Sequence, residues 1–223
     1  MVLMSERMVW GASTVVRSFF LIFAFSVTNL SQTVLPVQSP ADTLVQQLRD
    51  LPTPLPASVR SNGSVQPEER QRHKLYGQIR RFGNEGVLAL SRGLLDEDVQ
   101  LRKNVALAFN VLAGGWFDRS WPKLDIKSGL PALISALQDS DGSVRAWSAQ
   151  AIGEIGPDAA QAVPALVTLL SNTEEGSRNS ACIALRGIGP AAKEALPALL
   201  KSLADPSKDV RQFAAQAINS IQQ

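Results

Sequence analysis

The chain has few residues of the types that carry out covalent or metal chemistry. Its 223 residues include one cysteine, Cys182, and one histidine, His73. A structural zinc site usually takes four Cys or His ligands, and a single cysteine excludes an intramolecular disulfide. No nucleophile–base pair, glycine-rich phosphate loop or pair of carboxylates stands out. The sequence therefore predicts no catalytic residue, no metal site and no cofactor, and it favours a protein that is not an enzyme.

Regularly spaced arginines are the next feature, and their spacing belongs to an internal repeat. Arg145, Arg178 and Arg211 are 33 residues apart. Other positions recur in the same step: Pro-Ala-Leu at 131–133, 164–166 and 197–199; Asp139, Asn172 and Asp205; and Ile155, Ile188 and Ile221. A fixed period of this length predicts a stack of similar units.

Each unit predicts two helices. Proline suits the first turn of the first helix, where no amide hydrogen is needed, and Asp or Asn after it is typical of the start of a second helix. In the first complete copy, Val144, Ser148, Ala151, Ile152 and Ile155 have the spacing of a helix with one buried face. Gly-Pro at 156–157 and 189–190 then ends the second helix.

Two more variable units precede the regular ones. Asp96 and Arg102 match Asp139 and Arg145 at an offset of 43, and the extra residues fall in an aromatic insertion at 114–129. A first unit is expected to open with a helix at 43–50, followed by a Pro-rich loop at 51–67. We therefore expect an all-α fold, an α-solenoid of about five helical hairpins, degenerate over 43–130 and regular over 131–223.

The N-terminus has the pattern of a targeting segment. Residues 18–27 are mostly apolar and follow Arg7 and Arg17, but the run is short for a membrane span. Small residues near Ser26 fit a cleavage site, so we expect a signal peptide at 1–26 and a linker at 27–42. The alternative is an uncleaved membrane anchor. The predicted location is accordingly exported (periplasm, thylakoid lumen or secreted), or else anchored to a membrane.

The copies resemble HEAT repeats, in particular the short variety of the phycobilisome lyases. The resemblance is carried by Asp139, Val144-Arg145, Ala151-Ile152 and Ile155-Gly156-Pro157, and it covers roughly residues 70–223. The middle copy departs from the pattern, with Ser177 before Arg178 and Asn172 in place of the acid. The resemblance implies an armadillo-like helical solenoid, but it is weak for function because one repeat type serves many roles.

The resemblance also implies a structural role for the arginines. In the family such arginines pair with the acids of the turns, which we prefer to a phosphate-binding series. The expected structural ladder comprises Asp96, Arg102, Asp139, Arg145, Arg178, Asp205 and Arg211. Cys182 takes the place of Ala149 and Ala215 and is interpreted as a buried substitute for alanine. His73 stands alone between Arg72 and Lys74 and is a poor candidate for a catalytic base.

The second helices of such repeats usually line the concave surface, where solenoids bind ligands. Residues off their buried stripe form a tentative protein-binding groove: Lys74, Arg80, Lys103, Asn104, Trp147, Gln150, Asn179, Arg186, Gln212, Phe213 and Gln216. Aromatic residues and arginine are enriched at binding hot spots. The alternative is that Trp147 and Phe213 fold over neighbouring repeats. The insertion with Trp116 and Trp121 either joins the binding side or packs back onto the repeats.

A non-enzymatic scaffold or assembly factor that binds another protein or peptide is the leading functional hypothesis. The net charge of +2 is too small to predict a nucleic-acid partner, and the membrane enters only through the N-terminal segment if it stays uncleaved. The alternative, by resemblance only, is a bilin lyase or a lyase-chaperone subunit that acts on phycobiliproteins. An export signal argues against that alternative, since bilin attachment is expected in the cytoplasm or stroma.

Overall fold

The computed structural model describes residues 39–52, 66–114 and 123–223. The expected signal peptide and most of the linker lie outside the described residues, as do positions 53–65 of the Pro-rich loop and 115–122 of the aromatic insertion. Among the described residues, no helix combines the length and apolar character needed to cross a membrane.

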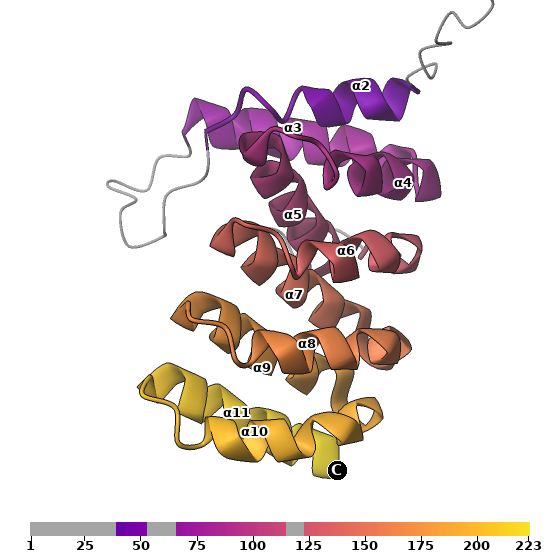
Figure 1. Ribbon diagram of the computed structural model, residues 1–223. Coiled ribbons are helices and arrows are strands. Elements are labelled where there is room, and N and C mark those ends of the chain that lie inside the picture. Colours follow the sequence, from indigo (N-terminus) through magenta and orange to yellow (C-terminus); the bar gives the residue numbers. More distant parts are fainter. Residues whose placement is uncertain (1–38, 53–65, 115–122) are drawn as a thin grey trace, which may run out of the picture. The chain divides into compact units, whose positions relative to one another are not determined.

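The described residues form five helical hairpins that follow one another along the chain (Figure 1). Their helix pairs are α2 (Pro40–Gln46) with α3 (Pro67–Arg81), α4 (Asn84–Gly93) with α5 (Val99–Gly114), α6 (Leu130–Ala136) with α7 (Gly142–Ile155), α8 (Val163–Leu169) with α9 (Glu175–Ile188), and α10 (Leu196–Ser202) with α11 (Lys208–Gln222). Short 3-10 helices precede the last three pairs: η2 (Lys127–Gly129), η3 (Gly156–Ala162) and η4 (Gly189–Ala195). The prediction of an α-solenoid of about five hairpins is confirmed.

The first helix begins earlier than expected, at Pro40 rather than Thr43. Ser39 explains the difference, because its Oγ accepts a hydrogen bond from the Asp42 amide while the Asp42 carboxylate accepts one from the Ser39 amide. Such a capping box satisfies two amide groups that a helix start leaves free. The segment expected as a linker therefore already contains the start of α2.

The second helices of successive hairpins pack directly on one another, from α5 through α7 and α9 to α11. The backbones of α7 and α9 come close where two glycines meet: a Cβ atom on Gly187 would overlap the backbone of Gly153, and one on Gly153 would lie 2.9 Å from the Ala184 Cα. Glycine is therefore required at this contact for reasons of space. The close approach brings the second helices together on one side of the stack.

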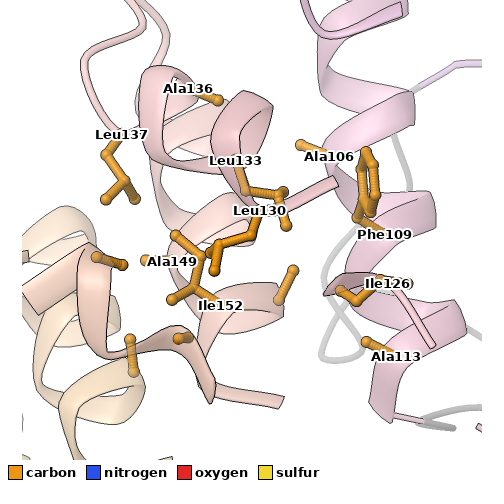
Figure 2. Packing of buried hydrophobic residues seen from close by; sticks show 14 of the residues in the cluster. Ala106, Phe109, Ala113, Ile126, Leu130, Leu133, Ala136, Leu137, Ala149 and Ile152 are labelled. Atoms are coloured by element: carbon orange, nitrogen blue, oxygen red, sulfur yellow. The ribbon is translucent and has the colours of Figure 1, made fainter. Parts of the chain in front are cut away.

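Buried side chains from neighbouring hairpins form one continuous core. Figure 2 shows Leu130 and Leu133 of α6 lying between Phe109 of α5 and Ile152 of α7. Three of these four side chains are fully buried, and Leu130 is nearly so. No hairpin can hide its apolar face alone, so each depends on its neighbours for stability.

Glycines with positive φ follow three of the second helices: Gly83 after α3, Gly156 after α7 and Gly189 after α9. Their φ angles are 54°, 77° and 65°, a region that side chains with a Cβ rarely adopt. Gly156 and Gly189 are the glycines that the repeat places before proline, and each leads into a 3-10 helix that carries the chain to the next hairpin.

Candidate binding surface and the arginine ladder

The arginine ladder joins the turn of each hairpin to the turn of the next. The Nη1 atom of Arg102 donates to the carbonyls of Asp96 and Glu97, both at 2.9 Å, in the turn of its own hairpin. The other edge of the same guanidinium reaches the next turn, where Nε and Nη2 donate to the two carboxylate oxygens of Asp139 at 2.7 and 3.2 Å. One side chain thereby holds two turns in register.

Arg178 repeats this arrangement two hairpins later. Its Nη1 donates to the carbonyls of Asn172 and Thr173, and its Nε and Nη2 donate to Asp205 at 2.8 and 3.0 Å. Both members of this pair are largely buried, as are Arg102 and Asp139. Bidentate, partly desolvated pairs of this kind stabilise a fold more than exposed pairs do.

Arg145 keeps its position but changes its partner. The turn that follows it carries Asn172 instead of an acid, and Arg145 Nη2 lies 2.7 Å from Glu174, while its Nε donates to Ser177 Oγ. The carbonyls of Asp139 and Ser140 still accept from Nη1. The residue types at 174 and 177 thus compensate for the missing acid, a substitution that the sequence pattern did not reveal.

The ladder begins differently. Asp96 takes its ion pair from Arg49, at 2.9 Å, rather than from an arginine on the preceding second helix. Arg72, which holds the ladder position on α3, is buried and donates to the carbonyl of Pro52. The first hairpin therefore uses an arginine from its turn to reach the next hairpin.

The ladder shifts the ionisation of its members. Burial raises the pKa of Asp139, but the hydrogen bonds from Arg102 and from the Asp141 amide outweigh burial and hold that pKa below its ordinary value. The pKa of Asp205 is lowered mainly by its hydrogen bond from Arg178. The pKa values of Arg102 and Arg178 are correspondingly raised. These groups are therefore charged at neutral pH, as a structural pair requires.

Trp147, Ser180 and Phe213 occupy the same register on three successive second helices, α7, α9 and α11. Trp147 and Phe213 are partly buried and pack against the core, and each side chain keeps an accessible part. The Arg186 guanidinium lies 5.8 Å from the centroid of the Phe213 ring.

Asn104 has the same register on α5, but the expectation that it faces a ligand is wrong. Its side chain is fully buried, and its Nδ2 donates to the carbonyls of Leu48 and Leu51, both at 2.7 Å. The segment after α2 thus covers this position of α5. In this register Trp147 on α7 and Phe213 on α11 keep a partly accessible side chain, whereas Ser180 on α9 is buried.

A hydrogen-bonded line crosses the second helices beside this row. Asn110 Nδ2 donates to Gln150 Oε1 at 3.1 Å, and Gln150 Nε2 donates to Ser180 Oγ at 3.3 Å. Asn110 is nearly buried, and the Oδ1 atoms of Asn110 and Asn179 are buried without a hydrogen-bond partner. Gln150 therefore takes part in holding α5, α7 and α9 together.

The charged residues of the expected groove mostly have partners within the protein. Lys103 Nζ lies 3.0 Å from Asp141, and Arg186 Nη1 donates to Gln216 Oε1 at 2.5 Å. Lys74 and Gln212 are exposed, and Arg80 is partly exposed. Over α7, α9 and α11 the candidate surface therefore presents mainly amide and aromatic side chains with one arginine.

The structure places the lone cysteine in the core and the lone histidine on α3. Cys182 is fully buried, and burial raises the pKa of its thiol to about 12, so the thiolate is not available at neutral pH. His73 is partly exposed on α3. Across the described ranges, no group of three or more His, Cys, Asp or Glu residues could hold a metal ion.

The hairpins, their direct packing and the ladder define a helical repeat solenoid, a scaffold of the kind that binds proteins and peptides. Residues 130–219 match the family model of HEAT repeats. These residues therefore carry HEAT repeats, as predicted from the motifs. The comparison with curated proteins gave no significant match.

Several solved structures are similar to this chain in fold. An engineered protein is 23% identical, with a TM-score of 0.55, over 82% of this chain and 79% of its own. A designed armadillo repeat protein in complex with the peptide (KR)4 is 23% identical, with a TM-score of 0.53, over 82% of each chain. The complex of CpcE and CpcF of phycocyanin lyase from Nostoc sp. PCC7120 is 22% identical, with a TM-score of 0.52, over 77% of this chain and 71% of that one.

Proposed function

We propose that this protein is an exported scaffold or assembly factor that binds a segment of another protein on the accessible face of the second helices α7, α9 and α11. The observation that carries the proposal is the row of Trp147 and Phe213 in equivalent positions, with Arg186 over the Phe213 ring. Aromatic rings and arginine give much contact energy for little loss of side-chain entropy. In solenoids this side is the usual binding side.

The chemistry of the face favours a protein ligand of low charge. Acids near it are already neutralised, because Asp141 pairs with Lys103 and Glu154 pairs with Lys123 at 2.8 Å. A strongly basic partner therefore finds few free carboxylates, and a nucleic acid finds few free cations. Amide side chains such as Gln212 and Gln216 can donate to and accept from the backbone of a bound segment.

A photo-crosslinking amino acid at Gln212, which is exposed on α11, would identify the partner, and the same group at exposed Gln138, in the turn after α6, is the matched control. The identified partner is then titrated against the wild type and against Trp147→Ala and Arg186→Ala. We expect at least a tenfold loss of affinity from Trp147→Ala, which corresponds to about 1.4 kcal/mol. Unchanged affinity in both variants would remove this face from the proposal.

Export is part of the proposal and rests on the sequence of residues 1–26. Mass spectrometry of the protein from its own cells would locate the mature N-terminus. Cleavage near Ser26 supports export, whereas an intact N-terminus in the membrane fraction supports the anchored form. A full-length protein in the cytosolic fraction would contradict both.

The alternative is a bilin lyase or a lyase-chaperone subunit, and the similarity to the CpcE–CpcF complex favours it over other enzyme classes. Co-expression with a phycobiliprotein and a bilin tests it directly. Covalent attachment of pigment that depends on this chain would place the alternative ahead of the scaffold.

A further inference from the structure

The helix α3 carries three exposed cations on one of its faces. Arg70, Lys74 and Arg81 are exposed, and their spacing along α3 puts them on the same side of the helix. That side lies opposite Leu75 and Ile79, which are buried in the core. We call Arg70, Lys74 and Arg81 the cationic stripe of α3.

The cationic stripe is not a product of the repeat. Lys74 stands two residues after Arg72, as Trp147 stands two residues after Arg145, so the positions of the stripe can be followed through the other second helices. The equivalent residues are Gln100, Asn104 and Val111 on α5; Ser143, Trp147 and Glu154 on α7; Gly176, Ser180 and Gly187 on α9; and Asp209, Phe213 and Ser220 on α11. None of these residues is cationic, so the charge belongs to α3 alone.

The cations of the stripe also differ from other accessible cations in their pairing. Arg92 pairs with Asp42, and Lys103 pairs with Asp141. Within the described ranges, none of the three cations of the stripe pairs with a carboxylate. Like charges four residues apart on a helix repel one another. A bound anionic group would relieve this repulsion.

We propose that the cationic stripe of α3 binds an acidic stretch of the protein whose segment lies on α7, α9 and α11. The identity of the partner rests on the proposed function, and the stripe adds the charge pattern of the bound segment. One part of the segment is low in charge and contacts Trp147 and Phe213, and another part carries several Asp or Glu residues and lies on α3. Two helix layers of 8–10 Å make roughly 20 Å between α3 and α7, so about six residues of extended chain join the two parts.

The distribution of charge favours a protein over a nucleic acid or a lipid surface. A phosphate backbone or an anionic membrane is negative along its whole extent. The positions equivalent to the stripe carry Glu154 on α7 and the exposed Asp209 on α11, which such a ligand would meet as like charges. A protein segment can place its acidic residues on α3 only, which is the charge pattern that the second helices present.

The first experiment titrates the full chain against a labelled peptide of alternating glutamate and serine, measured by fluorescence anisotropy at low salt. We expect saturable binding that weakens as salt is added, because exposed charges are screened. A variant with Arg70→Gln, Lys74→Gln and Arg81→Gln together should bind at least about fivefold more weakly. No binding of the acidic peptide would overturn the proposal.

The matched control makes the same change of net charge elsewhere. Lys193→Gln, Lys201→Gln and Lys208→Gln replace three exposed lysines of the last hairpin and should leave the affinity unchanged. An equal loss in this variant would mean that only net charge matters and would overturn the proposal. The same titration with an oligothymidylate and with phosphatidylserine vesicles tests the other anions. Tighter, stripe-dependent binding of either one would also overturn the proposal.

The second experiment uses the partner that crosslinks from Gln212 and separates this inference from the proposed function. The variant without the stripe cations should bind that partner at least about fivefold more weakly, and Trp147→Ala should weaken it independently. A loss from Trp147→Ala alone would refute the acidic stretch and leave the proposed function standing. Stripe-dependent binding of the acidic peptide, with no loss of the partner from Trp147→Ala, would refute the proposed function and leave the acidic ligand of α3.

Discussion

The two ends of the stack connect their hairpins by different means. From α5 to α11 the second helices pack directly on one another, and arginines tie each turn to the next. Between the first two hairpins, carbonyls of the segment Leu48–Pro52 accept hydrogen bonds from Asn104 on α5 and from Arg72 on α3. The first hairpin is thus joined to the second by polar side chains that bind an irregular backbone segment, in addition to the ion pair between Arg49 and Asp96.

This difference shows how a repeat protein tolerates a degenerate copy. A regular copy needs only its own motif, because its neighbour supplies the matching surface. A degenerate copy needs side chains suited to one particular backbone, and such side chains follow no period. The regular end should therefore respond to mutation in a similar way from copy to copy, and the degenerate end in ways that are specific to each position.

The largest expected effect is on the regular end. Arg178→Ala removes the partner of a largely buried Asp205 and should lower the free energy of unfolding by about 3 kcal/mol. Arg211→Ala is the matched control, because Arg211 makes the same turn contacts but has no carboxylate among the described residues, and should cost about 1 kcal/mol. Chemical denaturation measures both. Equal losses would show that the ion pair adds nothing.

The close approach of α7 and α9 gives the next largest effect. Gly187→Ala places a methyl group against the backbone of Gly153 and should cost about 2 kcal/mol, because backbone cannot give way as a flexible side chain can. Gly176→Ala in the same helix meets no atom within 4 Å and should stabilise by roughly 0.5–1 kcal/mol through helix propensity. Thermal or chemical unfolding of the pair separates crowding from propensity.

The regular end was predictable from sequence because its causes are periodic. The 33-residue step placed the helices, the glycines at 156 and 189, and the arginines, since each contact recurs with its residues. The replacement of an acidic partner by Glu174 and Ser177 was not predictable, because two neighbouring changes compensate for a third. The available signal was Asn172, which stands in the turn of the middle copy where the other copies carry an aspartate.

Exposure on the second helices was the less predictable property. Asn104 and Trp147 share one register, yet Asn104 is buried beneath the segment after α2 while Trp147 keeps an accessible part. The burial of Asn104 depends on a contact across more than fifty residues of sequence, which no local pattern records. Helix registers therefore predicted which residues lie on the same side of the second helices, but not which of those side chains are accessible.

Asn104 provides the test at the degenerate end. Asn104→Ala leaves the carbonyls of Leu48 and Leu51 without their donor and should cost about 2 kcal/mol. Hydrogen exchange should show faster exchange in α2 and the residues after it, with α9 and α11 unchanged, since each hairpin depends mainly on its neighbours. Gln212→Ala, at an exposed position, is the control. Uniformly faster exchange over all five hairpins would contradict the local character of this contact.

The smallest effect expected near neutral conditions is that of pH, and it distinguishes the ladder from the contact that Asn104 makes. Asp139 and Asp205 have pKa values below the ordinary 3.8 in the folded protein, so their contribution to stability is complete above that value and is lost as the pH falls through the folded pKa. Denaturation midpoints should therefore be flat from pH 7 to about 5 and fall below about 4. Asp139→Asn should weaken this acid-dependent fall, whereas Asp209→Asn, at an exposed carboxylate, should leave it unchanged. Because Asp139 and Asp205 lie in the turns that lead into α7 and α11, hydrogen exchange at pH 3 should accelerate in α7 and α11 more than at the contact between Asn104 and Leu48, which involves no carboxylate. An equal acceleration at the Asn104 contact would mean that the ladder does not account for acid sensitivity.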